Sequence, residues 1–456
     1  SELLTTLKTN TRWKRITVLL LLFAACGEFF IRAPLRLLHG TEWNDFLSPY
    51  IQSRAWLEGS DPYNLENFVK FWPHDKPIFT FVKKDAAAGT LAFNRGVPSP
   101  YPITSFVVLV PFGLLPWNAA ETLWLLLNLS ALLFVIGGLV ALAGVPWRDI
   151  RAWVFAAFSF GLAPIHTGLF TQNPIILVLA LGVAALCAVR KDREGLAALA
   201  LTIAICLKPQ VGLCFLIFFL VQRRWKPVIA CCGMSGAIFL LAVARLAAAE
   251  APWWISYLNV SHSVFARGGI NDFTPANPIW FQMINLQVAF FPLLPSAAAA
   301  NILALSVGLG FAVLWLLCAL KRSRDSDQLL TLSALAVISL LPVYHRFYDA
   351  ALLVFPAAWA VMGGGLPRKA AWSSLGLAAL FLTPGGVLIS RVAERAHLSA
   401  AFVNSWWWRS FIVAHQVWAL FLLAIVLLIA MRQAGGDSVN EQVGNSESAE
   451  LVPQAI

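Results

Sequence analysis

The sequence predicts an all-α polytopic membrane protein, and three observations carry that prediction. Of the 456 residues, 59% are hydrophobic and 12% are charged, whereas soluble domains carry about 25% charged residues. Apolar runs recur along the whole chain at roughly the 20 residues that a helix needs to cross the hydrocarbon core. These runs are continuous rather than alternating, which argues against a membrane β-barrel.

The apolar runs give the order of the predicted spans. We place them at 16–37, 102–117, 119–143, 151–170, 173–189, 194–207, 210–222, 226–247, 297–320, 327–343, 350–366, 371–388 and 405–431. They predict a single transmembrane domain over 1–432, with about 12 helices that cross the membrane. The first run is expected to be kept as a span, with a cytoplasmic N-terminus. The polar stretch 433–456 is expected to be a disordered cytoplasmic tail.

Clusters of Lys and Arg between the runs indicate which loops face the cytoplasm. They lie at 8–15, 190–193, 223–226, 321–324, 368–369 and 432. Cytoplasmic loops are enriched in Lys and Arg, so topology explains the net charge of +10 without nucleic-acid binding. We expect a multi-pass protein of the inner (plasma) membrane, with 38–100 and 248–296 as its large extracytoplasmic loops. Both loops contain amphipathic stretches, such as 48–57, that predict helices lying on the membrane.

One region does not fit a simple count of spans. An even number of spans must separate the first outer loop from Gln172, yet three runs lie between them. Either 102–117 is a re-entrant hairpin or one of the other runs does not cross fully. If Arg148 and Arg151 are cytoplasmic, 102–117 is the segment that turns back, and twelve spans remain.

The sequence contains none of the common motifs of soluble enzymes. It has no phosphate-binding Walker loop, no nucleophile elbow and no H-E-x-x-H metal motif. The seven Cys all lie in apolar runs without a C-x-x-C pair, so we expect neither a metal site nor a disulfide framework. The absence of an internal repeat argues against a transporter built from duplicated halves.

Asp45 is the leading candidate for catalysis. It follows the outer end of the first predicted span and lies among aromatic residues, where a carboxylate could act as a general base on a sugar hydroxyl. A structural explanation is equally open, because Asp is a common N-cap and a helix is predicted at 48–57.

A second polar group lies at the outer end of the span 327–343. It consists of Tyr344, His345, Arg346, Tyr348 and Asp349. Ionisable side chains at membrane depth are costly and tend to be functional. A belt of Tyr with a snorkelling Arg is the alternative. His and Asp are unusual in such a belt, so we favour a functional role.

Three further positions lie at the same predicted face. Lys208 separates two apolar runs on the side where cations are rare, which suggests an anionic partner such as a phosphate, although a snorkelling lysine is equally open. The amides of Gln172 and Asn173 either bind sugar hydroxyls or cap the next helix. Tyr101 ends the first large loop, before a helix start.

Taken in order, these short motifs resemble glycosyltransferase family 87 of the GT-C superfamily, the polyprenyl-phosphate-mannose-dependent mannosyltransferases. The resemblance covers residues 40 to about 360. It is carried by Asp45-Phe46, Gly59-Ser60-Asp61-Pro62-Tyr63, Tyr101-Pro102, Gln172-Asn173, Lys208-Pro209, Arg223-Arg224-Trp225 and His345-Arg346-Phe347-Tyr348-Asp349. The chain departs from the family at Ile103, where a second Pro is common, and at Thr171, where Gly is common. These departures bear on the substrate more than on the class.

The resemblance implies a GT-C-type helical bundle and an inverting sugar transfer at the extracytoplasmic face. The donor would be a polyprenyl-phosphate-linked sugar, with mannose expected, and the acceptor a glycolipid or glycan. Asp45 would take the acceptor proton, His345 would assist it or bind the donor, and Lys208 and Arg346 would stabilise the leaving phosphate. Substrate contacts are implied for Tyr101, Gln172, Asn173, Tyr348 and Asp349. No cofactor or metal is implied, because the leaving group carries a single phosphate.

Two other functions compete with this interpretation. A transporter or lipid flippase would place charged pairs at mid-membrane, and a non-catalytic scaffold would leave the large outer loop without a converging carboxylate. The enzyme hypothesis instead requires Asp45, Lys208 and His345 to meet at one cavity on the outer face.

Overall fold

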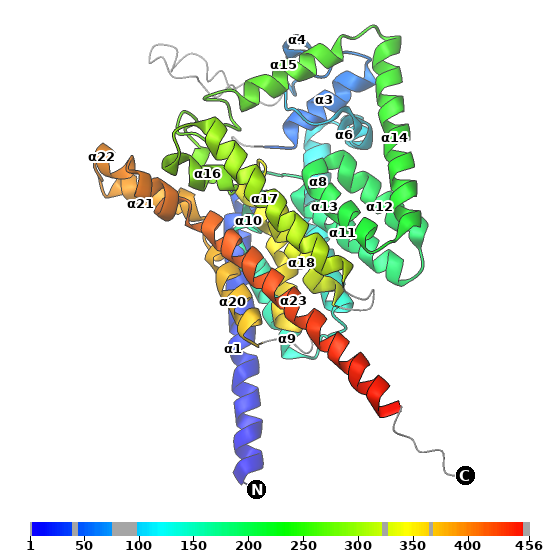
Figure 1. Cartoon of the computed structure of the whole chain (residues 1–456). Helices are drawn as coiled ribbons and strands as arrows, with labels where there is room; N and C mark the ends of the chain where they lie inside the picture. The colour runs from blue at the N-terminus through cyan, green and yellow to red at the C-terminus, as the bar shows by residue number, and fades with distance from the viewer. Residues whose placement is uncertain (1, 39–43, 75–97, 322–326, 364–367, 450–456) are drawn as a thin grey trace.

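The computed structural model describes the chain except residues 1, 39–43, 75–97, 322–326, 364–367 and 450–456, and it describes only the backbone of 2–11, 38, 368 and 434–449. The described residues contain no strand, and an isolated β-bridge joins Met283 to Arg346. The all-α prediction is confirmed. Figure 1 shows inclined helices with α3 (Leu47–Leu57), α4 (Leu65–Lys70) and α15 (Trp253–Phe265) gathered across one end.

The long helices follow the predicted runs. They are α1 (Glu2–Arg32), α8 (Trp117–Leu142), α9 (Ile150–Gly161), α10 (Ala163–Phe170), α11 (Ile175–Arg190), α12 (Glu194–Leu207), α13 (Pro209–Val221), α14 (Trp225–Ala248), α17 (Ala297–Leu320), α18 (Gln328–Ser339), α19 (Val354–Met362), α20 (Arg368–Ala379) and α23 (His415–Ala449). Short helices connect them: α2 (Pro34–Leu38), α6 (Ile103–Val108), α7 (Val110–Gly113), α16 (Leu286–Phe290), α21 (Gly385–Arg395) and α22 (Ala400–Val403). The remaining turns are the 3₁₀ segments η1 (Trp280–Gln282), η2 (Phe291–Leu293), η3 (Phe347–Leu353) and η4 (Leu380–Leu382) and the π-helical η5 (Trp408–Val413).

Within the described residues, 5 helices are long and apolar enough to cross a membrane, or up to 7 if each bent pair is one span. The bent pairs are α9 with α10, at 52°, and the α20–η4 segment with α21, at 49°. Each break has a proline nearby, Pro164 or Pro384, which has no N–H for the helical ladder. A multi-pass membrane protein is therefore supported. The predicted count of about 12 spans requires that the shorter helices cross as well.

Helix ends that are far apart in the sequence meet at one end of the bundle. Arg190 and Arg224, from two of the predicted cytoplasmic clusters, line a cavity there together with Asp327 and Gly363. The cluster at 321–324 lies outside the described residues except for Lys321. The two clusters therefore lie close together, an arrangement that the positive-inside rule predicts. We call this the basic end.

The segment 102–117 begins and finishes at the opposite end, where Asn44 donates a hydrogen bond to Glu121 at 2.8 Å; we call this the site end. Tyr50 Oη donates to the carbonyl of Leu115 at 2.8 Å, which fixes the last part of the segment beside α3. Glu121 lies near the start of α8, and the helix continues from there to Leu142, which lines the cavity at the basic end. Because α6 and α7 have only 6 and 4 residues, the segment turns back, in agreement with the re-entrant alternative.

The helix α12 is short, and this places the residue after it inside the bundle. α12 has 14 residues and α14 has 24. Lys226 pairs with Glu194 at 3.3 Å, so the two helices begin at the same level. With a rise of 1.5 Å per residue, α12 ends about 15 Å below the far end of α14. Lys208 is therefore recessed rather than placed at the protein surface.

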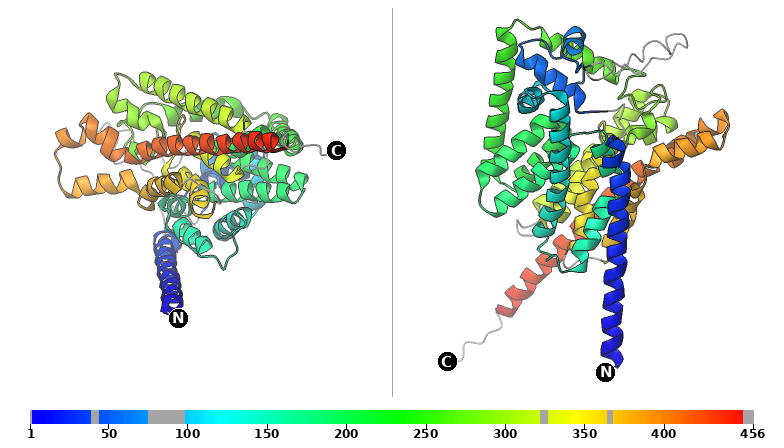
Figure 2. Two further views of the ribbon diagram at one scale, coloured as in Figure 1. Left: turned by 60° about the horizontal axis from the view of Figure 1, so that its bottom comes forward. Right: turned by 180° about the vertical axis from the view of Figure 1, so that it is seen from behind.

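Two details differ from the sequence-based picture. The helix α3 is largely buried against α6 and α7 instead of lying exposed on a membrane surface. Such close packing is possible because Gly113 has no side chain to collide with Ser53. The predicted disordered tail is helical in its backbone up to Ala449, and 450–456 lie outside the described residues. Glu28 and Arg32, one turn apart on α1, form an ion pair at 3.0 Å. Figure 2 shows the extended ends of α1 and α23 diverging from the bundle.

Candidate active site

A continuous chain of polar contacts joins five predicted site residues at the site end. Asn173 Nδ2 donates to Asp45 Oδ2 at 2.9 Å, and Lys208 Nζ donates to Asn173 Oδ1 at 2.9 Å. Lys208 Nζ also pairs with Asp349 Oδ1 at 2.5 Å. The other oxygen of Asp349 lies 3.1 Å from His345 Nδ1. Residues separated by as many as 304 positions, Asp45 and Asp349, thus belong to one network.

Two breaks between helices project the polar side chains into the bundle. Lys208 stands between α12 and α13, ahead of Pro209, with an extended backbone. Gln172 adopts a left-handed conformation, φ 55°, between α10 and α11, and Asn173 follows it. In a continuous helix these side chains would point away from the helix axis. Because the helix is interrupted at each break, they can point into the bundle instead. Lys208 is only 3% exposed, and an uncompensated buried ammonium would be very costly, so its contacts to Asp349 and Asn173 hold this part of the fold together.

Asp45 is anchored on both sides of its backbone. Its N–H donates to the carbonyl of Thr171 at 2.7 Å. The next residue, Phe46, is fully buried and stacks on Trp124 with ring centroids 4.4 Å apart and planes at 5°. Asn44 Oδ1, rather than Asp45, accepts from the N–H groups of Phe46 and Leu47 ahead of α3. The N-cap explanation of Asp45 is therefore wrong, and its carboxylate is directed at Asn173.

Glu121, which the sequence analysis did not single out, clamps the two segments beside Asp45. Its Oε1 accepts from Asn44 Nδ2 at 2.8 Å and from Gln172 Nε2 at 3.2 Å. Asn44 precedes Asp45 and Gln172 precedes Asn173, so one carboxylate holds both neighbours of the Asp45–Asn173 hydrogen bond. The available signal was an acidic residue in the first turns of an otherwise apolar run, at 119–143.

Arg346 connects the network to two tyrosines and to the second large loop. Its Nε donates to Tyr344 Oη at 2.6 Å and its Nη2 donates to the carbonyl of Ile270 at 2.9 Å. The Nζ of Lys208 lies 4.4 Å from the ring centre of Tyr348, a cation–π distance. Nη1 of Arg346 makes no hydrogen bond to any described residue, so it remains able to contact an anion.

Exposure divides the site into two rows. The residues of the open row are half-buried: Asp45, Tyr101, Tyr344, Arg346 and Tyr348. The residues of the closed row are buried, at 0–3% exposure: Gln172, Asn173, Lys208, His345 and Asp349. Only the open row is placed to touch a substrate without rearrangement.

This division changes the roles that the sequence suggested. Lys208 and Asp349 neutralise each other, so Lys208 lacks the free charge expected of a phosphate ligand. Asp349 contacts Lys208 and His345 instead of facing a substrate. Gln172 and Asn173 use their amides to hold Glu121 and Asp45. His345 keeps one distinctive property: its Nε2 is buried without a hydrogen-bond partner among the described residues.

The electrostatics of the open row agree with its geometry. Burial, with the nearby carboxylates of Asp45 and Asp349, raises the pKa of Tyr101 well above its usual value. Burial likewise raises the pKa of Tyr344 to about 12. Both phenols therefore stay neutral at pH 7 and can donate hydrogen bonds. For Arg346, burial disfavours the charge, but Tyr344, Tyr348 and Asp45 outweigh it and raise the pKa.

The expected cavity around Asp45, Lys208 and His345 is not reproduced by the two cavities that we describe. A small one, about 10 Å³, is lined by Phe46, Tyr101 and Leu207 and so borders the site. The large one lies at the basic end. The three residues do meet in one network, although the space beside them is narrow.

Comparison with known proteins identifies the class. The model of glycosyltransferase family 87 matches residues 100–343, more than half of the chain. The match includes Tyr101, Gln172, Asn173 and Lys208 but neither Asp45 nor the segment from His345 onward. Searches of curated proteins and of solved structures gave no match. The family match and the apolar helices agree that this chain is a membrane glycosyltransferase, and it belongs to glycosyltransferase family 87.

Proposed function

We propose that this protein transfers a sugar from a polyprenyl-phosphate donor to a glycolipid or glycan acceptor at the extracytoplasmic face of the inner (plasma) membrane. Mannose is the proposed sugar. The observation that carries the proposal is the half-buried Asp45 carboxylate, which the buried amide of Asn173 holds near Arg346 and two neutral tyrosines, Tyr101 and Tyr344.

The proposed reaction is a single displacement with inversion at the anomeric carbon. The acceptor oxygen forms a bond to that carbon, and the bond to the lipid-phosphate oxygen breaks. Asp45 takes the acceptor proton as general base, a role that contributes about 10²–10⁴-fold in enzymes generally. The electron pair of the broken bond leaves with the lipid phosphate, whose negative charge increases in the transition state.

Arg346 and the tyrosines of the open row serve that leaving phosphate. Arg346 is held by Tyr344 and Ile270, so its remaining donors are oriented before the substrate arrives. Charge that is already in place when the phosphate departs stabilises the transition state more than the ground state. Lys208, Asp349 and Asn173 then act behind this row by positioning Asp45, rather than by contacting the donor themselves.

The depth of the site suits a donor that stays in the bilayer. Lys208 lies about 15 Å below the far end of α14, by the helix rise. A phosphate joined to a long apolar chain can reach such a position with the chain still among the helices. A water-soluble nucleotide sugar would have to lose its hydration to reach the same place.

The test is transfer by the purified full-length protein, using radiolabelled polyprenyl-phosphate mannose and a lipid-extract acceptor. Asp45→Asn keeps the shape and one hydrogen bond to Asn173 but removes the base, so we expect activity to fall by about 10²-fold or more. Glu66→Gln, which changes an exposed carboxylate on α4, should keep wild-type activity. Full activity in Asp45→Asn would overturn Asp45 as base; transfer from a different sugar donor alone would overturn the substrate.

A further inference from the structure

The cavity at the basic end carries an inference independent of the sugar transfer. It encloses about 540 Å³ between the ends of α8, α11 and α13 and the start of α18. Pockets of about 300–1,000 Å³ are the usual size for small ligands and cofactors. It lies at the opposite end of α8 from Glu121 and is therefore separate from the candidate active site.

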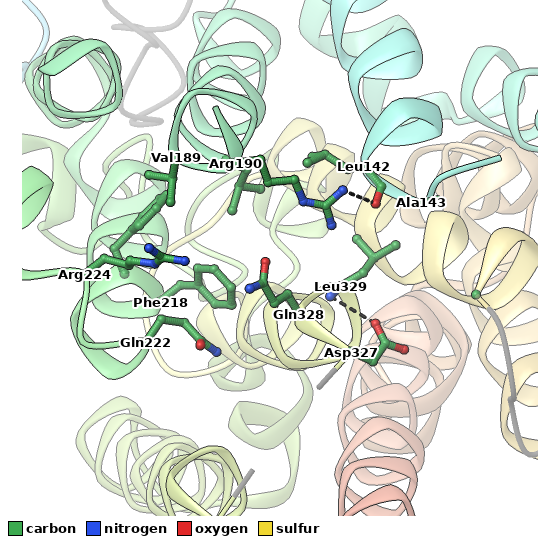
Figure 3. A pocket seen from close by; sticks show the side chains of 13 residues that line it. Leu142, Ala143, Val189, Arg190, Phe218, Gln222, Arg224, Asp327, Gln328 and Leu329 are labelled. Carbon is green, nitrogen blue, oxygen red and sulfur yellow. Dashed lines mark hydrogen bonds between the residues drawn. The ribbon is translucent and has the colours of Figure 1, made fainter. Parts of the chain in front are cut away.

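Unpaired polar side chains line this cavity. Arg224 is half-buried, yet its guanidinium makes no hydrogen bond or ion pair with any residue that the structure describes. The same holds for the side-chain amide of Gln222. In Figure 3 both lie on one side of the cavity, with Gln328 next to them. An unpaired guanidinium in a partly closed space indicates that a partner is supplied from outside the chain.

The opposite side of the cavity contributes a second guanidinium. Arg190 Nη1 donates to the carbonyl of Leu142 at the end of α8, which leaves Nε and Nη2 for another ligand. The nearby carboxylate of Asp327 is already occupied. It accepts from the N–H groups of Leu329 and Leu330 and from Trp359 Nε1 and forms no ion pair with either arginine, so its single negative charge offsets at most one of the two positive charges. The cavity therefore has a positive balance.

The remaining lining is apolar. It is formed by Leu142, Leu186, Val189, Phe218, Phe219 and Leu329. A small hydrated anion has no apolar surface to bury against such walls. The glycerol and the first methylenes of a phospholipid do have apolar surface, and burying it is favourable. Basic pockets between transmembrane helices on the cytoplasmic side are a known way to bind anionic headgroups. Neighbouring surfaces of α13 expose Leu213, Ile217 and Leu220, which gives acyl chains an apolar face.

We propose that this cavity binds the phosphate headgroup of an anionic phospholipid, with Arg224 and Arg190 on the phosphate oxygens and Gln222 as an additional donor. The ligand class is a lipid phosphate rather than a free one, because apolar side chains line the cavity beside the arginines and an apolar face of α13 adjoins it. The proposal does not depend on the sugar or the donor of the catalysed reaction.

The experiment is native mass spectrometry of the delipidated full-length protein, titrated with phosphatidylglycerol or with phosphatidylcholine of the same acyl chains. We expect phosphatidylglycerol to bind more tightly, and Arg224→Gln to weaken it about 10-fold, the loss typical of one charged hydrogen-bond partner. The matched control is Arg148→Gln, which removes an exposed Arg at the same end that does not line the cavity. It should change the affinity less than about 2-fold.

Gln222→Glu is the second variant. It keeps both arginines and adds a negative charge to the cavity, so it should weaken phosphatidylglycerol binding at least as much as Arg224→Gln. If Arg224→Gln and Arg148→Gln lose the same affinity for phosphatidylglycerol, the lipid is attracted only by the overall positive charge of the surface. That result would overturn the proposed site. Equal binding of the two lipids would also overturn it. Complete displacement by millimolar inorganic phosphate would assign the cavity to a soluble anion and overturn the lipid.

Discussion

The two ends of this helical bundle handle charge in opposite ways. At the site end, the buried Lys208 is balanced by Asp349 and Asn173, and the carboxylate of Asp45 is fixed by an amide. At the basic end, Arg224 faces a large cavity and has no partner among the described residues. A network whose charges are already paired is suited to orienting chemistry, because little has to move when substrate arrives. An unpaired charge beside open space is suited to capturing a ligand.

The largest effect is expected from removing one member of the buried ion pair between Lys208 and Asp349. Lys208→Met leaves the carboxylate of Asp349 buried without its counterion. We expect a loss of about 3–5 kcal/mol in the free energy of unfolding, seen as a lower thermal midpoint in detergent. The double variant with Asp349→Asn should recover part of that loss. If the single and double variants unfold alike, the pair does not act as a unit.

His345 allows a sharper test of the closed row. The amide of His345→Asn can replace Nδ1 and keep the hydrogen bond to Asp349, while that of His345→Gln can replace Nε2. If the unpartnered Nε2 serves the reaction, the Asn variant should lose about 10²-fold in kcat at near-normal stability, and the Gln variant should keep more activity. The reverse order would assign His345 to orienting Asp349 alone. Sugar transfer and thermal unfolding, measured on both variants, decide between them.

Glu121 should have an intermediate effect, because it acts through its neighbours. Glu121→Leu removes Oε1, the oxygen that accepts both amide hydrogen bonds, from Asn44 and from Gln172. Misplacement of Asp45 should lower kcat by about 10-fold or more with the KM for donor little changed. A rise in KM alone would instead place Glu121 in donor binding. Glu66→Leu on the exposed side of α4 is the matched control.

The smallest effect is expected at the basic end. Since Arg224 has no partner in the part of the chain that the structure describes, Arg224→Gln should change the unfolding free energy of the delipidated protein by less than about 0.5 kcal/mol. The same measurement with Lys208→Met then compares a paired charge and an unpaired charge of one protein directly. A large loss in Arg224→Gln would mean that this guanidinium stabilises the fold itself, and the contrast would disappear.

Much of the architecture could be predicted from hydrophobic runs, because membrane helices have to satisfy their own backbone. The breaks at Lys208 and Gln172 were also visible, since polar residues next to prolines interrupt apolar segments. The partners of these residues were not visible. Lys208 pairs with a carboxylate far along the chain, and nothing local distinguishes a paired lysine from one that is free to bind phosphate.

Other parts of the site were hidden for the same kind of reason. Asn44 and Asp45 are adjacent and both are good caps, and only the direction of the chain entering α3 decides that Asn44 takes that role. Glu121 looked like the edge of a span, because its two amide partners come from different segments. The cavity at the basic end forms from five separated stretches of the chain, so no single stretch of sequence indicates it.

The pairing of Lys208 with Asp349 also has a consequence for the synthesis of the chain, because the two residues are made at different times. About 140 residues separate the two, and ribosomes add roughly 5–20 residues per second, so the lysine is made on the order of 10 seconds before its counterion. Throughout that interval the α12–α13 hairpin carries an uncompensated ammonium. The hairpin therefore has to be held near water or by the insertion machinery until the segment after α18 emerges. If synthesis stops between the two residues, the ammonium of Lys208 never meets the carboxylate of Asp349, and the first half of the chain cannot pack as it does in the complete protein. Formation of this pair therefore depends on completion of the chain.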